Sequence, residues 1–220
     1  MYLIYSLVFV IALTLIFTDI IRKKAIAFYG ISSIIAVLVT VYEILRLTSN
    51  YQLGGFIGTL EKVFMRGNVS IAFFILVMFA GALNKKLKVT KKLMSIRAEN
   101  AIMGSILIMP HCIMYFVRFL VKLSAGKQFT TLYFIYLVVG ILAFILMIPL
   151  FITSFKKIRM KMKFSDWKRL QRKAYIFYLL AYVHIVVVLL NGKTIDFLKL
   201  ITYTVIFLAY LILKLFRNRK

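Results

Sequence analysis

Long apolar stretches alternate with short polar connections along the whole chain. Each stretch carries few charges and is about twenty residues long, which is enough to cross roughly 30 Å of hydrocarbon at about 1.5 Å rise per residue. We expect transmembrane helices at residues 2–21, 25–45, 69–84, 99–121, 129–154, 172–190 and 196–214. The sequence lacks the ten-residue alternating segments of an outer-membrane barrel. The predicted fold is therefore an all-α, polytopic transmembrane bundle of about seven helices.

The first apolar stretch differs from a secretory signal. No basic residues precede it, and no small-residue cleavage site follows it. We therefore expect it to remain in the mature protein.

The connection at residues 50–68 has an amphipathic pattern. Its apolar residues recur at helical spacing and are Phe56, Ile57, Leu60, Val63 and Phe64. This pattern predicts an interfacial helix on the outer leaflet, with a lid over a cofactor or a partner-docking ridge as the alternative. The chain is expected to divide into residues 1–68, which hold two transmembrane helices and this outer amphipathic loop, and residues 69–220.

Composition supports a membrane location. Hydrophobic residues make up 63% of the 220 residues, charged residues only 16%, and the mean hydropathy is +0.96, values that a water-soluble domain does not reach. Of the 30 Lys and Arg residues, 22 lie in one alternating set of connections and 8 on the other side. Positive residues favour the cytoplasmic side, so we expect a cytoplasmic (inner) membrane protein with its N-terminus outside and its C-terminus in the cytoplasm.

The net charge of +24 does not indicate a nucleic-acid partner, because it is spread over four short segments rather than one folded surface. Membrane lipid with anionic headgroups is the expected partner. The densest basic run, residues 156–173, is either a stop-transfer and lipid-contact loop or a docking surface for a cytoplasmic protein or an anionic cofactor.

With Cys112 as the only cysteine, internal disulfides and cysteine-ligated iron–sulfur clusters are excluded.

The two histidines are the most informative polar residues. His111 and His184 each lie about 13 residues into an expected span, and both spans run outward from the cytoplasm on the charge count. The two imidazoles are therefore expected at similar membrane depths. Ionisable groups in hydrocarbon are costly and are functional candidates by default.

Several roles remain open for such a pair. The imidazoles could ligate haem iron, share a proton relay, bind copper or zinc, or hydrogen-bond to neighbouring helices. A metal held by protein alone normally needs more ligands, and no Asp or Glu lies within a turn of either histidine. A haem needs only two axial ligands from the protein.

Arg118, seven residues after His111 and about 10 Å further out, is placed either to pair with haem propionates or to snorkel at the helix end.

Two sequence stretches resemble a known family. They are RAENAIMGSILIMPH from Arg97 to His111 and DWKRLQRKAYIFYLLAYVH from Asp166 to His184. Both are similar to the ferric reductase-like transmembrane domain, which includes the membrane part of NADPH oxidases and the haem-binding membrane subunit of the periplasmic methionine sulfoxide reductase system. The resemblance covers roughly residues 69–215 and implies that residues 69–220 form the haem-binding helices.

The resemblance implies one haem rather than two. The family commonly uses two histidine pairs, and here the outer pair corresponds to His111 and His184, which are the implied axial ligands of one haem b. The inner pair corresponds to Arg97 and Gln171, neither of which is a usual haem ligand. A flavin such as FMN, held near these two residues, Trp167 and Arg169, is one implied electron source.

The sequence therefore predicts a transmembrane electron-transfer protein that passes electrons to an extracytoplasmic acceptor or partner protein. Because only a short basic tail follows the last expected span, we expect a separate electron donor such as a membrane quinol or a flavin reductase. The protein would then be a membrane oxidoreductase subunit. The main alternative is a non-redox membrane scaffold or assembly subunit whose histidines bond across helices. A small transporter is less consistent, since no acidic residue lies in mid-membrane.

Overall fold

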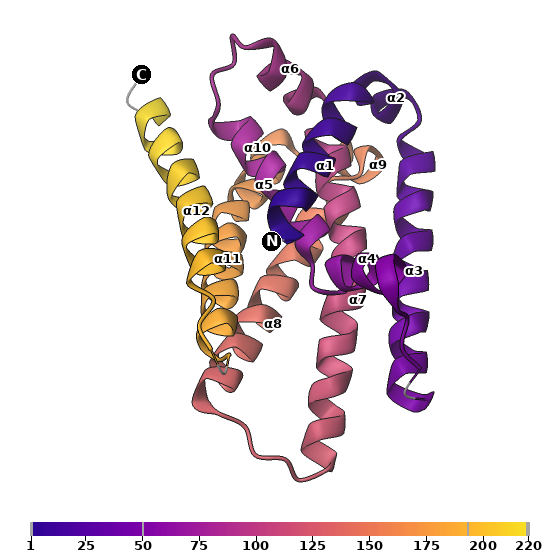
Figure 1. The fold of residues 1–220 in the computed structure, drawn as a ribbon. Coiled ribbons are helices and arrows are strands. Elements are labelled where there is room, and N and C mark those ends of the chain that lie inside the picture. The colour runs from indigo at the N-terminus through magenta and orange to yellow at the C-terminus, as the bar shows by residue number, and fades with distance from the viewer. Residues whose placement is uncertain (1, 50, 193, 219–220) are drawn as a thin grey trace. The chain divides into compact units, whose positions relative to one another are not determined.

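The computed structural model describes residues 2–49, 51–192 and 194–218, and every regular element among them is an α-helix. The prediction of an all-α fold is confirmed. The chain forms two compact units, Met1–Lys122 and Leu123–Lys220. Figure 1 labels the helices of both units.

The first unit is built around a buried central helix. Its elements are α1 (Tyr2–Ile16), α2 (Thr18–Lys23), α3 (Ala25–Ser49), α4 (Gly55–Met65), α5 (Asn68–Ala82), α6 (Lys88–Ser95) and α7 (Arg97–Ser124). Twelve of the 15 residues of α5 are buried, and this helix packs against α1, α4 and α6. On α7, Gly104 allows a close approach, because a Cβ there would lie 3.0 Å from the Cβ of Phe73 on α5. Apolarity in α5 thus serves protein packing.

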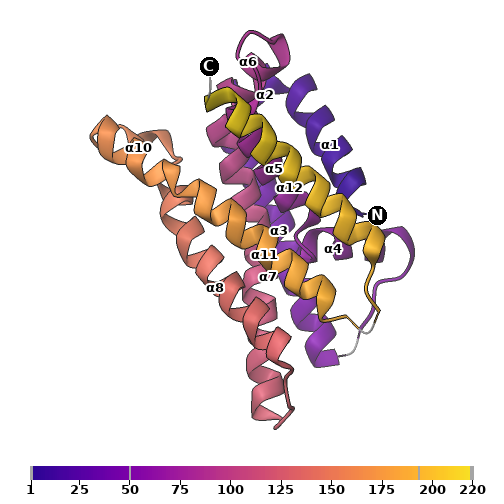
Figure 2. The same ribbon diagram turned by 90° about the vertical axis from the view of Figure 1, so that its left-hand side faces the viewer.

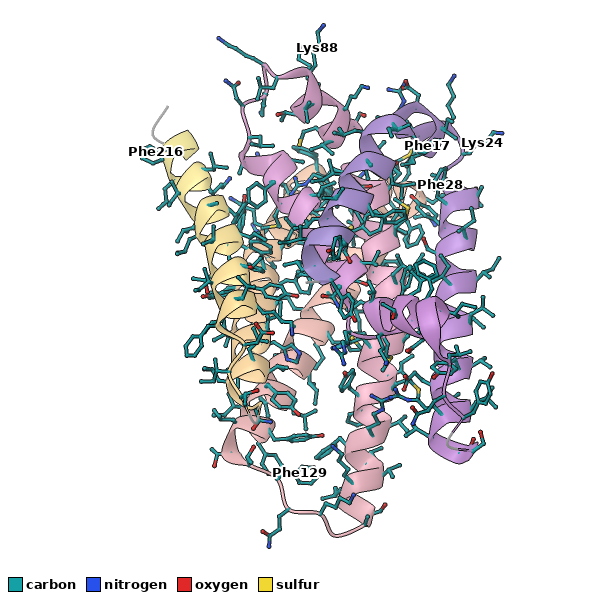
Figure 3. All side chains as sticks on the ribbon, viewed as in Figure 1. Phe17, Lys24, Phe28, Lys88, Phe129 and Phe216 are labelled. Carbon is teal, nitrogen blue, oxygen red and sulfur yellow. The ribbon has the colours of Figure 1, made fainter. Side chains whose placement is uncertain are left out.

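The first predicted span is a broken helix. The break falls at Phe17, and Figure 3 labels this residue together with Phe28, which packs against the core of the unit. Two buried hydroxyls near the break bond back to the helix: Thr14 donates to the Val10 carbonyl at 2.7 Å, and Thr18 donates to the Thr14 carbonyl at 2.6 Å. Such back-bonding satisfies the hydroxyls in an apolar setting and commonly accompanies helix bending.

Five helical segments are long and apolar enough to cross a membrane. They are Ala25–Ser49, Arg97–Ser124, Thr131–Ile152, Phe164–Leu190 and Phe197–Phe216. A sixth is obtained if α4 and α5, which meet at a bend of 48°, form one broken span. All seven predicted stretches contain helices, but α1 and α5 are only 15 residues long. Although α5 is too short to cross the bilayer, its apolar side chains are covered by the protein itself.

The predicted amphipathic helix at residues 50–68 is present as α4. Its exposed face carries Phe56 and Ile57, which are 79% and 63% exposed, and its buried face carries Gly58, Glu61 and Met65. The outer-leaflet location of this helix stays a prediction.

The second unit is a helical hairpin with a third helix beside it. Its elements are α8 (Thr131–Ile152), α9 (Lys156–Arg159), α10 (Phe164–Arg172), α11 (Ala174–Leu190) and α12 (Phe197–Asn218). The main packing is between α8 and α11, and Figure 2 shows α10 running on from α11. Aromatic contacts join α11 to α12, where the rings of Tyr178 and Phe207 stack with centroids 4.2 Å apart. Tyr182 also packs on Phe207 at 4.9 Å.

Candidate functional site

His111 lies on α7, and its ring is oriented by the end of α4. The His111 Nδ1 atom is 3.0 Å from the carbonyl oxygen of Met65, the last residue of α4. A carbonyl only accepts hydrogen bonds, so Nδ1 must carry the proton and donate it. In the neutral ring the lone pair is then on Nε2, the nitrogen that would ligate a metal. The last carbonyls of a helix lack intrahelical partners, so this bond also satisfies the end of α4.

A glycine turn brings that carbonyl to the histidine. Gly67 joins α4 to α5 with φ = 72°, a left-handed conformation that favours glycine. A Cβ at this position would lie 2.7 Å from Ile108 Cδ1 and 3.9 Å from the His111 ring. The left-handed backbone favours glycine here, and an added Cβ would require the flexible end of the Ile108 side chain to move.

His184 on α11 has the same arrangement with different partners. Its Nδ1 atom donates to the Tyr136 carbonyl on α8, at 2.8 Å. One helical turn further along, a Cβ at Gly140 would lie 2.9 Å from both Cε1 and Nδ1 of His184. In an α-helix the carbonyl of residue 136 faces the amide of residue 140, so the missing side chain leaves this carbonyl accessible. Gly140 thus gives the imidazole both its space and its hydrogen-bond acceptor.

Each histidine also has a tyrosine neighbour. The rings of His111 and Tyr115 lie 4.6 Å apart between centroids, and those of His184 and Tyr136 lie 5.9 Å apart at 86°. Tyr115, on the same helix as His111, therefore contacts that histidine ring. Tyr178 and Tyr182, by contrast, pack on α12.

Arg118 forms an ion pair within the first unit. Its Nη2 atom donates to Oε2 of Glu43 on α3, and the guanidinium lies over the Tyr115 ring at 5.3 Å. The Glu43 side chain is fully buried, and the same oxygen also pairs with Arg46 at 3.1 Å. The Arg46 partner is only three residues from Glu43, whereas the Arg118 partner is 75 residues away and is not apparent from the sequence. The predicted contact of Arg118 with haem propionates stays a prediction.

The two residues at the positions of the inner histidine pair are held by hydrogen bonds within their own units. In the first unit, Arg97 Nε donates to the Val77 carbonyl at 3.0 Å. In the second unit, Gln171 donates to the Thr153 hydroxyl at 3.1 Å, and the Trp167 indole donates to the Thr153 carbonyl at 3.2 Å. A guanidinium has no lone pair to offer, and an amide is a poor iron ligand. These residues fit a structural role at the ends of helices.

No group of three or more His, Cys, Asp or Glu residues close enough to hold a metal ion occurs in the part of the chain that the structure describes. Cys112 forms no disulfide and is partly buried.

The comparison with known families identifies a match over about half of the chain. Residues 66–182 match the family described as "Ferric reductase like transmembrane component". The chain belongs to this family. The match includes His111 and Gly140 and ends two residues before His184. With its apolar spans, membership makes the protein a multi-pass membrane protein and suggests membrane electron transfer.

A relative from Treponema pallidum (strain Nichols) is 37% identical over 150 residues and is described as an uncharacterized protein. The alignment covers 66% of this chain and 41% of the relative, so the chain spans about two fifths of the length of that protein.

Proposed function

We propose that the protein is a transmembrane electron-transfer protein that holds one haem b between His111 and His184 and serves an extracytoplasmic acceptor. The observation that carries the proposal is that both imidazoles have the same hydrogen bond and therefore the same tautomer. Each donates its Nδ1 proton to a backbone carbonyl, at 3.0 Å and 2.8 Å. Metal-ligating histidines typically make this bond, which fixes the tautomer and directs Nε2 to the metal.

The same bonds argue against the other roles considered for the pair. A proton relay needs a partner that can take up and release a proton, which a backbone carbonyl does not do. A zinc or copper ion held by protein would need further ligands, and none gather in the described residues. A scaffold function explains each hydrogen bond singly. It does not explain why the His184 ring occupies the space that a side chain at Gly140 would need.

When bound, haem supplies an iron that takes up and gives back one electron at a time. The residues of the chain hold, orient and shield it. Two Nε2 atoms would provide the axial ligands, and the apolar helices would keep water away. Arg118 would pair with a propionate while retaining Glu43, because a guanidinium carries five N–H donors.

The direction of electron flow follows from the proposed topology. We place the N-terminus outside and the C-terminus in the cytoplasm, in the cytoplasmic (inner) membrane, on the distribution of Lys and Arg. The donor is proposed to be a membrane quinol or a separate flavin reductase. FMN near Arg97 and Gln171 remains the alternative source, and a lack of flavin release from the denatured protein would count against it.

The test is a dithionite-reduced minus oxidised visible spectrum of the detergent-purified protein, with haem quantified per chain. We expect a b-type spectrum and about one haem per chain, the stoichiometry for which two axial ligands suffice. His111→Ala and His184→Ala should each lose the haem, whereas Cys112→Ser, next to the ligand on α7, should retain it. A haem-free protein, or unchanged haem in either histidine variant, would favour the scaffold.

A further inference from the structure

The segment between α8 and α11 is strongly basic and largely exposed. Residues 156–173 contain nine Lys or Arg residues and one acidic residue, Asp166. Eight of the nine basic side chains are exposed, and Arg159 is half-buried. The haem proposal uses none of them. We call this segment the basic turn.

The basic turn is fixed at the end of an apolar helix. Trp167 and Gln171 of α10 both bond to Thr153, which directly follows α8, at 3.2 Å and 3.1 Å. Because α8 is long and apolar enough to span the hydrocarbon, its end lies near the level where lipid headgroups begin. Tryptophan is enriched at this level, where its ring meets hydrocarbon and its N–H meets polar groups.

A pocket opens in the basic turn. It has a volume of about 330 Å³ and is lined by Arg159, Met160, Met162, Phe164 and Trp167. The Arg159 guanidinium lies 5.5 Å from the Trp167 ring centroid, and the Phe164 ring lies 5.8 Å from the same ring. The pocket thus combines one cation with four large apolar or sulfur-containing side chains.

The exposed apolar side chains need an apolar partner. Met160 is 72% exposed and Phe164 is 71% exposed, although both lie among lysines and arginines. A soluble acidic protein would match the charge but would not by itself account for apolar walls at membrane level. A molecule with an anionic head and an apolar body matches both.

We propose that this pocket is a binding site for an anionic phospholipid. The phosphate would contact Arg159, and the glycerol and upper acyl chain would cover Met160 and Phe164. The surrounding lysines and arginines would raise the local concentration of anionic lipid. The site is independent of the haem, so it is tested without reference to redox activity.

The single tryptophan of the chain provides the readout, since Trp167 lines the pocket. The full-length protein is reconstituted into phosphatidylcholine vesicles that contain phosphatidylglycerol. Brominated acyl chains, which quench tryptophan on contact, are carried either by the phosphatidylglycerol or by an equal mole fraction of phosphatidylcholine. Each intensity is divided by that of the same protein in unbrominated lipid, which removes quenching by any haem.

We expect the anionic lipid to be enriched about fivefold at Trp167, the ratio that corresponds to about 1 kcal/mol per basic residue near the surface. Arg159→Gln should remove most of the preference and leave only the part due to the surrounding basic residues, and Arg159→Lys should keep most of it. Arg172→Gln is the matched control, because it removes an exposed charge of the basic turn outside the pocket. The preference should also fall as salt is raised.

Equal quenching by the two brominated lipids in the wild-type protein would overturn the proposal. A preference that Arg159→Gln and Arg172→Gln reduce equally would also overturn it, because it would indicate diffuse attraction without a site. Saturable quenching of Trp167 by added FMN, with no lipid preference, would assign the pocket to a flavin instead.

Discussion

At the scale of single residues, the ring of His184 leaves no room for a side chain at position 140. A Cβ there would lie 2.9 Å from two ring atoms, so Gly140→Ala should displace the imidazole and weaken haem retention. Overpacking of this kind costs about 1–3 kcal/mol. The measurement is haem per chain together with the low-spin electron paramagnetic resonance signal. Gly30→Ala on α3, where nothing lies within 4 Å of the new Cβ, is the control and should leave both unchanged. An unaltered signal in Gly140→Ala would contradict this reading of the contact.

A second residue-scale prediction concerns Glu43, whose buried carboxylate joins α3 to α7. Glu43→Gln leaves Arg118, whose side chain is 18% exposed, without its carboxylate, and the loss of one partner of a buried pair costs about 3–5 kcal/mol. Because Arg46 and Arg118 are partly exposed to solvent, the loss in unfolding free energy should lie at or below the low end of this range. Thermal unfolding in detergent measures it, and adding Arg118→Gln should cost less than the sum of the single changes.

The matched control is an exposed pair in the same unit. Asp19 and Arg22 pair at 3.1 Å with side chains 73% and 55% exposed. Asp19→Asn should shift unfolding very little, since exposed pairs contribute about 0–1 kcal/mol. Equal effects of Asp19→Asn and Glu43→Gln would mean that the Glu43 pair is no more than a surface pair.

At the scale of elements, the hydrogen bond between His111 and Met65 is best tested through the turn between α4 and α5. The acceptor is a backbone carbonyl, which a side-chain substitution does not remove. Gly67→Ala introduces both an unfavourable positive φ and a contact of 2.7 Å with Ile108. We expect it to lower haem content more than Gly126→Ala does. Gly126 has a similar φ of 66° but nothing within 4 Å, so it isolates the conformational cost. Equal haem content in the two variants would show that crowding at the turn does not reach His111.

Some elements were predictable from hydropathy, and others were not. The sequence predicted the spans that contain α3, α7, α8 and α12 because each of these helices includes a long, mostly apolar run without a charged residue. The break in α1 was not predictable, since it depends on Thr14 and Thr18 bonding to nearby carbonyls. The burial of α5 was also missed, because an apolar helix covered by protein has the same composition as one covered by lipid. The glycines beside the histidines gave no signal, since their role depends on approaches between helices distant in sequence.

At the scale of the whole molecule, membrane orientation is the main open prediction, and the single cysteine makes it testable. In a Cys112→Ser background, Ser165→Cys in the basic turn should react with a membrane-impermeant maleimide only after the cells are permeabilised. Thr59→Cys on α4 should react in intact cells. These outcomes follow from the concentration of Lys and Arg on the cytoplasmic side. Labelling of Ser165→Cys in intact cells would invert the topology and with it the proposed direction of electron flow.

The choice of main-chain acceptors for both imidazoles bears on how this protein can diverge over evolution. A carbonyl is present whatever side chain stands at positions 65 and 136, so the two hydrogen bonds themselves place no demand on the identity of either residue. Selection would act more directly on Gly67, whose φ is 72°, and on Gly140, where a Cβ would lie 2.9 Å from the His184 ring. A comparison of related sequences that considered only the histidines and nearby polar side chains would therefore miss the glycines and main-chain carbonyls that orient the imidazoles.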